Sequence, residues 1–453
     1  MSNGFTGADV AQLRQLAAAM HGAGHRLQLQ LGTFNTRVIG TLWPGPDAEQ
    51  FRHDWKTSHT LVLREAVLFL HQSADELTRN ADEQEAASLP GGSGPSTGPA
   101  GSSNGTSEYT SGPVRPDDLM GKSAAQIKDW WSGLTAGQKQ AFIRNYPVEA
   151  GNTNGIPFDA RVEANRINAQ NRIDWLNEND PEPRFNPFLM DAGYPQRFTD
   201  EHKAWEKRQS YLQRVVDGKI RLAAYDPAAQ SIVELKGTYD ENTTTVITYV
   251  PGTTTNEASF HDGGPQRLPA RLVEDDQSGG TAAFVYKGSE FPDGDPVEAF
   301  LVEAKSDEFV ARSAPVLRAF QGAVDLELPP GAQSVGVGHS WGVRNLTGAE
   351  NEGAHYDKLL ALSGAAMPPG WVPDPGTEYS SFTYPDILLT AEANGVVGEN
   401  YPMKEPAFEK HVYEPPGGNG WTEFYSIDNH SLIATTYEEN DQALRDMRKE
   451  IRQ

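Results

Sequence analysis

The chain has no cysteine among its 453 residues. Disulfide bonds, thiolate metal ligands and a cysteine nucleophile are therefore excluded. The chain also has no Walker lysine in a glycine-rich loop, no G-x-G-x-x-G after a predicted strand, and no cluster of residues with metal-ligand spacing. We therefore expect a protein that works without a cofactor and without a metal ion.

Long apolar runs and an excess of basic residues are missing too. No stretch approaches the ~18 apolar residues of a membrane helix, and the N-terminus lacks the basic and then apolar segments of a signal peptide. Asp and Glu outnumber Lys and Arg by 62 to 38, for a net charge of −24. Because phosphate binding needs a basic face, this charge argues against nucleic-acid binding and mainly favours solubility. We expect a cytoplasmic location unless the chain is exported as folded helices.

Residues 1–87 carry the pattern of two helices. Apolar residues recur at helical spacings over residues 8–31 and 47–85. Prolines and a glycine separate the two stretches, and Asp47 is placed to cap the second helix. With Trp43 and Gly45 at its turn, this hairpin resembles the WxG family of small helical hairpins that type VII secretion systems export.

The WxG resemblance implies export by a type VII-like system and a second helical hairpin as protein partner. The secretion tag of that family, a tyrosine followed four residues later by an acid, is missing after the second helix. The residues themselves fit a plain dimerising or docking hairpin equally well.

Residues 88–115 consist mainly of glycine, serine, threonine and proline. Such a composition buries too little apolar surface to offset the entropy of ordering, so we predict a flexible linker. The larger domain is then expected over residues 116–453, beginning with a helical lead-in at 116–217.

The helical lead-in contains a run of closely spaced glycine, asparagine and arginine residues. It reads G-N-x-x-G-I-P and then R-x-x-A-N-R, formed by Gly151, Asn152, Gly155, Ile156, Pro157, Arg161, Ala164, Asn165 and Arg166. Arg161 and Asn165 share one helical face, so we predict that they hold a loop in place rather than take part in catalysis. With the preceding Trp130 and Trp131, this run resembles an actinobacterial α/β-hydrolase family of unassigned function. The resemblance extends over residues 116–453 and implies the α/β-hydrolase fold.

Strand and helix patterns alternate after the lead-in. Helices are predicted at 201–216, 309–320, 343–350 and 431–451, and strands at 219–225, 244–250, 281–286, before Ser340, 358–362 and 387–390. This alternation predicts an α/β protein with a mostly parallel sheet.

Ser340 stands in the pattern G-x-S-x-G with Gly338 and Gly342. A chain of this length and composition shows the bare pattern by chance about 0.3 times, and residues 101–105 carry it inside the predicted linker. Context must therefore decide. A short apolar run precedes Ser340 and a helix-compatible stretch follows it, which predicts the strand, sharp turn and helix of a nucleophile elbow.

A serine nucleophile needs a base, usually a histidine that follows it in α/β-hydrolases. Three histidines follow Ser340. His355 immediately precedes a predicted strand, at the wrong end for the catalytic edge, and His411 lies in a charged run that is typical of a solvated surface. His430 lies in a loop before the last helix, so we predict His430 as the base.

The acid that orients this histidine is expected in the loop after residues 387–390. The resemblance implies an aspartate at the position that Asn394 occupies here. An asparagine can orient an imidazole but cannot stabilise its charged form. Glu392 is our preferred candidate and Asp428 a further alternative, although Asp428 is close in sequence to His430.

The oxyanion of the reaction would be held by two backbone N–H groups. One belongs to Trp341, directly after the nucleophile. The other belongs to Thr253 or Thr254, in the polar turn that follows Gly252 and the strand 244–250. The Trp341 side chain is large enough to wall the acyl pocket, and simple packing under the elbow explains it equally well.

These residues predict a serine hydrolase that cleaves a small-molecule ester, a lipid among the candidates, through an acyl-enzyme at Ser340. The alternative is a type VII-linked effector or partner-binding protein whose hydrolase fold is catalytically impaired, because Asn394 replaces the expected aspartate.

Overall fold

The computed structural model describes residues 114–185, 194–292, 307–386, 400–416 and 427–452. The chain divides into two units between residues 107 and 108, and all described residues belong to the second. The hairpin predicted for residues 1–87 lies outside the described ranges, as does nearly all of the linker predicted for 88–115.

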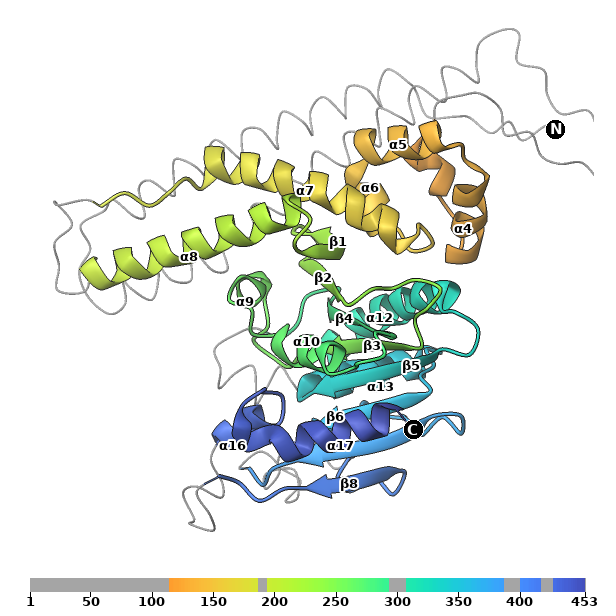
Figure 1. The fold of residues 1–453 in the computed structure, drawn as a ribbon, viewed down its shortest axis with the longest axis vertical. Coiled ribbons are helices and arrows are strands. Elements are labelled where there is room, and N and C mark those ends of the chain that lie inside the picture. The colour runs from red at the N-terminus through yellow and green to blue at the C-terminus, as the bar shows by residue number, and fades with distance from the viewer. Residues whose placement is uncertain (1–113, 186–193, 293–306, 387–399, 417–426, 453) are drawn as a thin grey trace, which may run out of the picture. The chain divides into compact units, whose positions relative to one another are not determined.

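An eight-stranded sheet forms the centre of the fold (Figure 1). Its strands are β1 (Arg221–Asp226), β2 (Ser231–Lys236), β3 (Thr245–Val250), β4 (Thr281–Lys287), β5 (Gln333–His339), β6 (Lys358–Leu362), β7 (Glu378–Thr383) and β8 (Phe408–Val412). Their order is β1-β2-β4-β3-β5-β6-β7-β8. β2 pairs antiparallel with both β1 and β4, and all pairings along β4-β3-β5-β6-β7-β8 are parallel. The predicted mostly parallel α/β sheet is confirmed.

The described helices come before the sheet, between its strands and after it. They are α4 (Ala124–Gly133), α5 (Ala136–Asn145), α6 (Pro147–Asn152), α7 (Phe158–Asn179), α8 (Tyr194–Val216), α9 (Glu257–His261), α10 (Arg267–Glu274), α12 (Asp307–Glu327), α13 (Trp341–Asn351), α16 (Ile427–Leu432) and α17 (Asp441–Arg452). Among these helices, none is both long and apolar enough to cross a membrane.

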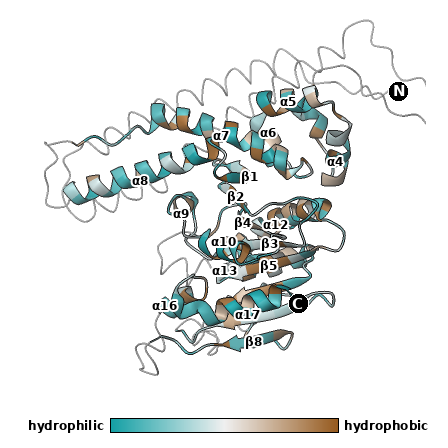
Figure 2. Cartoon of the chain, viewed as in Figure 1, coloured by the Kyte–Doolittle hydropathy of each residue, from teal (hydrophilic) through white to brown (hydrophobic). Residues whose placement is uncertain are grey.

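Both faces of the central strands are buried, as expected for parallel strands covered by helices. All six residues of β3 are buried. Val246 and Val250 pack in one apolar cluster with α12 and α13, whereas Ile247 and Tyr249 pack in another with α8, α10 and α17. This alternation follows from the two-residue period of a strand. Figure 2 shows α17 with hydrophilic and hydrophobic residues interleaved, as a helix with one buried side requires.

The lead-in helices are tied to the sheet by buried amides. Asn165 of α7 donates to the carbonyl oxygens of Gly151 and Leu222, both at 2.9 Å. Asn152 binds both backbone groups of Tyr225. A Cβ on Gly151 would lie 2.2 Å from the Asn165 side chain, so only glycine fits there. These contacts support the predicted holding role of Asn165, but they tie α7 to helix α6 and strand β1 rather than to a loop.

Replacing Asn165 with alanine tests this role. The change removes the Asn165 amide from the carbonyl oxygens of Gly151 and Leu222, and we expect the free energy of unfolding in urea to fall by about 2 kcal/mol. The control is Gln170→Ala on the same helix, since the Gln170 amide donates to Asp174 at the surface. It should change stability by less than about 0.5 kcal/mol. Equal losses in both variants would contradict the assigned role.

Three strands were not predicted from the sequence. β7 contains Ser380, Ser381 and Thr383, all buried, and its polar composition conceals it. β8 is an edge strand with mostly exposed residues, and β2 is only six residues long and lacks a regular alternation of polar and apolar residues. The strand predicted at 387–390 lies outside the described residues.

The predicted helix over residues 431–451 is wrong in its extent. α16 ends at Leu432, and α17 begins only at Asp441. Asn440 separates them, because its side-chain amide donates to the carbonyl oxygens of Ile433 and Thr435 and stabilises a turn. A side chain that caps backbone groups in this way competes with a continuous helix.

Candidate active site

Ser340 lies between β5 and α13 with φ 53° and ψ −121°. A positive φ is strained for any residue with a Cβ and is expected at a nucleophile elbow. The backbone is held there on both sides, because Ser340 N–H donates to Leu362 and its carbonyl accepts from Ala365. The predicted strand, turn and helix around Ser340 are all present.

The two glycines of the motif are required by close backbone contacts. A Cβ on Gly338 would lie 2.7 Å from the backbone nitrogen of Val343, and one on Gly342 would lie 2.0 Å from the carbonyl oxygen of Val250. Strand β5, helix α13 and the end of β3 therefore approach one another more closely than side chains allow.

His430 lies in α16 and is buried together with Asp386, which follows β7 by three residues. Nδ1 of His430 is 3.2 Å from Oδ2 of Asp386. The amide of Asn429 donates to the carbonyl oxygen of Pro385 and so ties helix α16, which carries the histidine, to the segment after β7 that carries the aspartate. The chain order serine, aspartate, histidine is that of α/β-hydrolases.

Asp386 was missed by the sequence analysis. The acid was expected after a strand at 387–390, whereas the strand that precedes it is β7. Glu392 and Asn394 lie outside the described residues. Asp428 is exposed in the first turn of α16. An aspartate soon after a short strand rich in aromatic and hydroxyl residues was the available signal.

The predicted oxyanion turn lies against the nucleophile. A Cβ on Gly252 would lie 3.1 Å from Cβ of Ser340. Thr254 N–H already donates to the carbonyl oxygen of Pro292 at 2.6 Å, which leaves Thr253 as the better placed of the two predicted residues. In the described part of the chain, the buried Thr253 Oγ1 has no hydrogen-bond partner.

Trp341 contributes its backbone and its side chain differently. It is the first residue of α13, and the first N–H groups of a helix have no acceptor within that helix. Its indole is fully buried and packs on Phe291 with ring centroids 4.7 Å apart. The side chain thus fits the packing interpretation.

His339, directly before Ser340, connects the elbow to helix α16, which carries His430. Its Nε2 is 3.0 Å from the backbone carbonyl oxygen of His430, and the two ring centroids are 5.3 Å apart. Burial, with a smaller contribution from the nearby His430, lowers the pKa of His339 to about 4. His339 is therefore neutral at physiological pH.

This pKa predicts how stability depends on pH. Below pH 6.5 the unfolded chain binds a proton at His339 that the folded chain takes up only near pH 4. Stability is therefore fully present above pH 6.5 and is lost as the pH falls, by about 3 kcal/mol at pH 4. Between pH 6.5 and pH 4, we expect the unfolding free energy of His339→Gln in urea titrations to fall by about 3 kcal/mol less than that of the wild type. Parallel stability profiles for the variant and the wild type would contradict the prediction.

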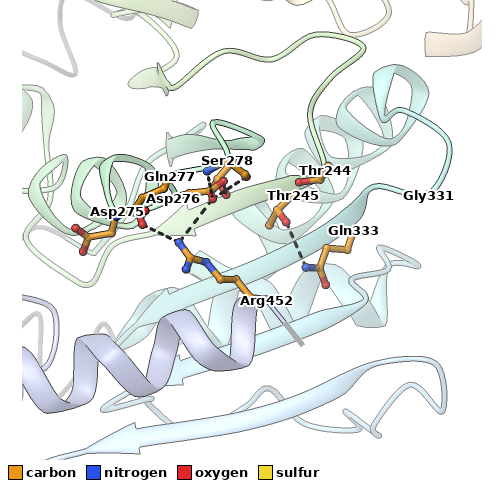
Figure 3. Close-up of a pocket in the computed structure, with 10 residues that line it drawn as sticks. Thr244, Thr245, Asp275, Asp276, Gln277, Ser278, Gly331, Gln333 and Arg452 are labelled. Atoms are coloured by element: carbon orange, nitrogen blue, oxygen red, sulfur yellow. Dashed lines mark hydrogen bonds and ion pairs between the residues drawn. The ribbon is translucent and has the colours of Figure 1, made fainter.

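A polar hollow of about 740 Å³ lies at the end of the sheet where the parallel strands β3 and β5 begin (Figure 3). Thr244 and Thr245 line it at the start of β3, whereas Ser340 follows the end of the parallel strand β5. Arg452 reaches into it and lies 3.6 Å from Asp276. The hollow is therefore separate from the elbow.

Among the described residues, one group of side chains has the geometry of a metal site. Glu409 and His411 of β8 and Glu450 of α17 bring ligand atoms within 4.8 Å of one another. The strand and helix are distant in sequence, which is why no metal-ligand spacing was visible. His411 stacks on Phe382 with the rings 8° from parallel, so this histidine is half-buried rather than fully solvated.

The strand order and the elbow define the α/β-hydrolase fold. Among solved structures, the chain is similar to a dienelactone hydrolase-like promiscuous phosphotriesterase from metagenomic libraries, at 13% identity over 50% of this chain and 94% of that one, with a TM-score of 0.31. It is also similar to the esterase LipW from Mycobacterium marinum, at 11% identity over 60% of this chain and 96% of that one, with a TM-score of 0.33. These scores are low, so the fold assignment rests on the strand order and the elbow.

Two uncharacterized proteins from two strains of Mycobacterium tuberculosis are each 36% identical to the chain over 58 residues. The match covers 12% of this chain and 9% of theirs, so the chain spans only a small part of these relatives. No family model matches the chain. The expected resemblance to an actinobacterial family is thus supported in part, and the WxG resemblance concerns residues outside the described ranges.

Proposed function

We propose that the protein is a serine hydrolase that cleaves a carboxylic ester, lipid esters included, through an acyl-enzyme at Ser340. The main support is the strained backbone of Ser340 at the elbow. His339, directly before it, is hydrogen-bonded to the backbone of His430 in α16. The buried carboxylate of Asp386 beside His430 supplies the partner that a catalytic imidazole needs.

In the proposed first step, Nε2 of His430 accepts the hydroxyl proton of Ser340 as Oγ bonds to the ester carbonyl carbon. Asp386 accepts a hydrogen bond from Nδ1–H of His430, which selects the tautomer and stabilises the imidazolium. The backbone N–H of Trp341 and a donor at Thr253 hold the oxyanion, and losing one such donor typically costs about 3 kcal/mol in the transition state.

The tetrahedral intermediate then collapses. The carbon–oxygen bond to the leaving alcohol breaks, and His430 gives that alcohol the proton taken from Ser340. Water next attacks the acyl-enzyme while His430 removes its proton. The bond from the acyl carbon to Oγ breaks, and His430 returns the proton to Ser340.

A fluorophosphonate probe tests the proposed function. The probe forms a stable bond to an activated serine, and mass spectrometry of the digested protein should locate it on the peptide that contains Ser340. Heat-denatured protein is the control, because a serine without its base does not react. Absence of the adduct from the native protein would refute the proposal.

The impaired-enzyme alternative was based on Asn394. Asp386 removes that ground, because a carboxylate is present beside His430 whatever residue occupies position 394. We therefore favour the active hydrolase.

A further inference from the structure

His339 contacts two parts of the candidate site besides Ser340. Its Nε2 lies 3.0 Å from the carbonyl oxygen of His430. A Cβ on Gly252 would lie 3.3 Å from Nδ1 of the same ring, so the backbone of the oxyanion turn lies against the imidazole. His339 thus lies between the backbone of His430, the predicted base, and the turn at Gly252, which precedes the predicted oxyanion donor Thr253.

The chemistry of the contact fixes the state of the ring. A carbonyl oxygen can only accept a hydrogen bond, so Nε2 of His339 must carry the hydrogen. The lowered pKa of this half-buried ring keeps it neutral, and its Nδ1 faces Gly252. A neutral donor fixes the His430 backbone without placing a positive charge beside the imidazole that must accept a proton.

We propose that His339 is a positioning residue that holds the backbone of His430 and the turn at Gly252 in register with Ser340. This inference rests on the proposed serine hydrolase function. His430 has two anchors in this arrangement, Asp386 on its ring and His339 on its backbone. The ring anchor sets the tautomer, and the backbone anchor sets where the imidazole stands relative to Oγ of Ser340.

The test compares two substitutions in the full chain. His339→Phe keeps a planar ring but removes the donor, whereas His339→Gln keeps an amide N–H near the position of Nε2. With p-nitrophenyl butyrate as substrate, we expect His339→Phe to lower kcat about 10- to 100-fold, the scale of a small misplacement of catalytic groups. KM should stay nearly unchanged, and His339→Gln should recover most of the rate.

Each kcat is divided by the fraction of molecules that the fluorophosphonate has labelled when labelling is complete. This normalisation removes the contribution of misfolded protein. His355→Gln is the control, because this exposed histidine precedes β6 and pairs with Asp374, outside the candidate site. It should match the wild type. A wild-type rate in His339→Phe, or an equal loss in His339→Gln and His339→Phe, would overturn the inference while leaving the proposed function intact.

Nitrogen-15 histidine NMR gives a readout that needs no activity. We expect the side-chain resonances of His430, assigned from their loss in His430→Gln, to shift in His339→Phe and to return toward the wild-type position in His339→Gln. If the wild type neither hydrolyses the ester nor labels, the proposed function fails and this measurement still decides the positioning role. Identical His430 resonances in all three proteins would overturn it.

Discussion

Alanine at position 340 is expected to abolish ester hydrolysis, with kcat falling roughly a million-fold. The reason is that Oγ of Ser340 forms the covalent bond of the proposed reaction. Fluorophosphonate labelling should disappear with it. The measurement is the hydrolysis of p-nitrophenyl butyrate, together with the mass of the labelled protein.

Ser340→Gly is the matched control for folding. Both variants lack the nucleophile, but glycine adopts a φ of 53° without strain whereas alanine does not. We expect Ser340→Gly to be inactive and more stable than Ser340→Ala, by about 1 kcal/mol in urea denaturation. Residual labelling of either variant at the wild-type rate would show that another serine reacts.

Replacing Asp386 with asparagine is expected to lower kcat about ten-thousandfold. The amide can still contact Nδ1 of His430, but it favours the wrong tautomer and cannot stabilise the imidazolium. KM should change little, since Asp386 is buried behind His430. Circular dichroism should report a folded protein, which separates the loss of chemistry from the loss of structure.

Two substitutions compare the other acids of the same region. Glu392→Gln and Asp428→Asn should each keep nearly the wild-type kcat if Asp386 is the partner of His430. A large loss in Glu392→Gln together with a mild effect of Asp386→Asn would instead return the role to Glu392, the acid preferred from the sequence.

The elbow could be predicted because its evidence is local. Gly338, Ser340 and Gly342 lie within five residues, and the strand and helix adjoin them directly. His430 could be selected as the candidate base by elimination, since only three histidines follow Ser340. The mostly parallel sheet likewise follows from the alternation of apolar strands with helices.

Asp386, the candidate acid, could not be predicted because it follows a strand without an apolar pattern. β7 lies between β6 and β8, and five of its six residues are buried although its composition is mostly polar. The role of His339 was missed for a related reason. Its contact with His430 joins residues 91 positions apart, and no pattern near the G-x-S-x-G motif reveals which loop returns to it.

The attachment of the lead-in to the sheet also determines the order in which the domain can fold during synthesis. Phe158 N–H donates to the carboxylate of Glu327, which the ribosome adds 169 residues later. The hydrogen bond from Asn165 to Leu222 likewise needs a residue that is synthesised later. Contacts of such sequence separation slow folding, because a long loop must close before they form. The helices made first can therefore complete these hydrogen bonds only after the central strands have emerged.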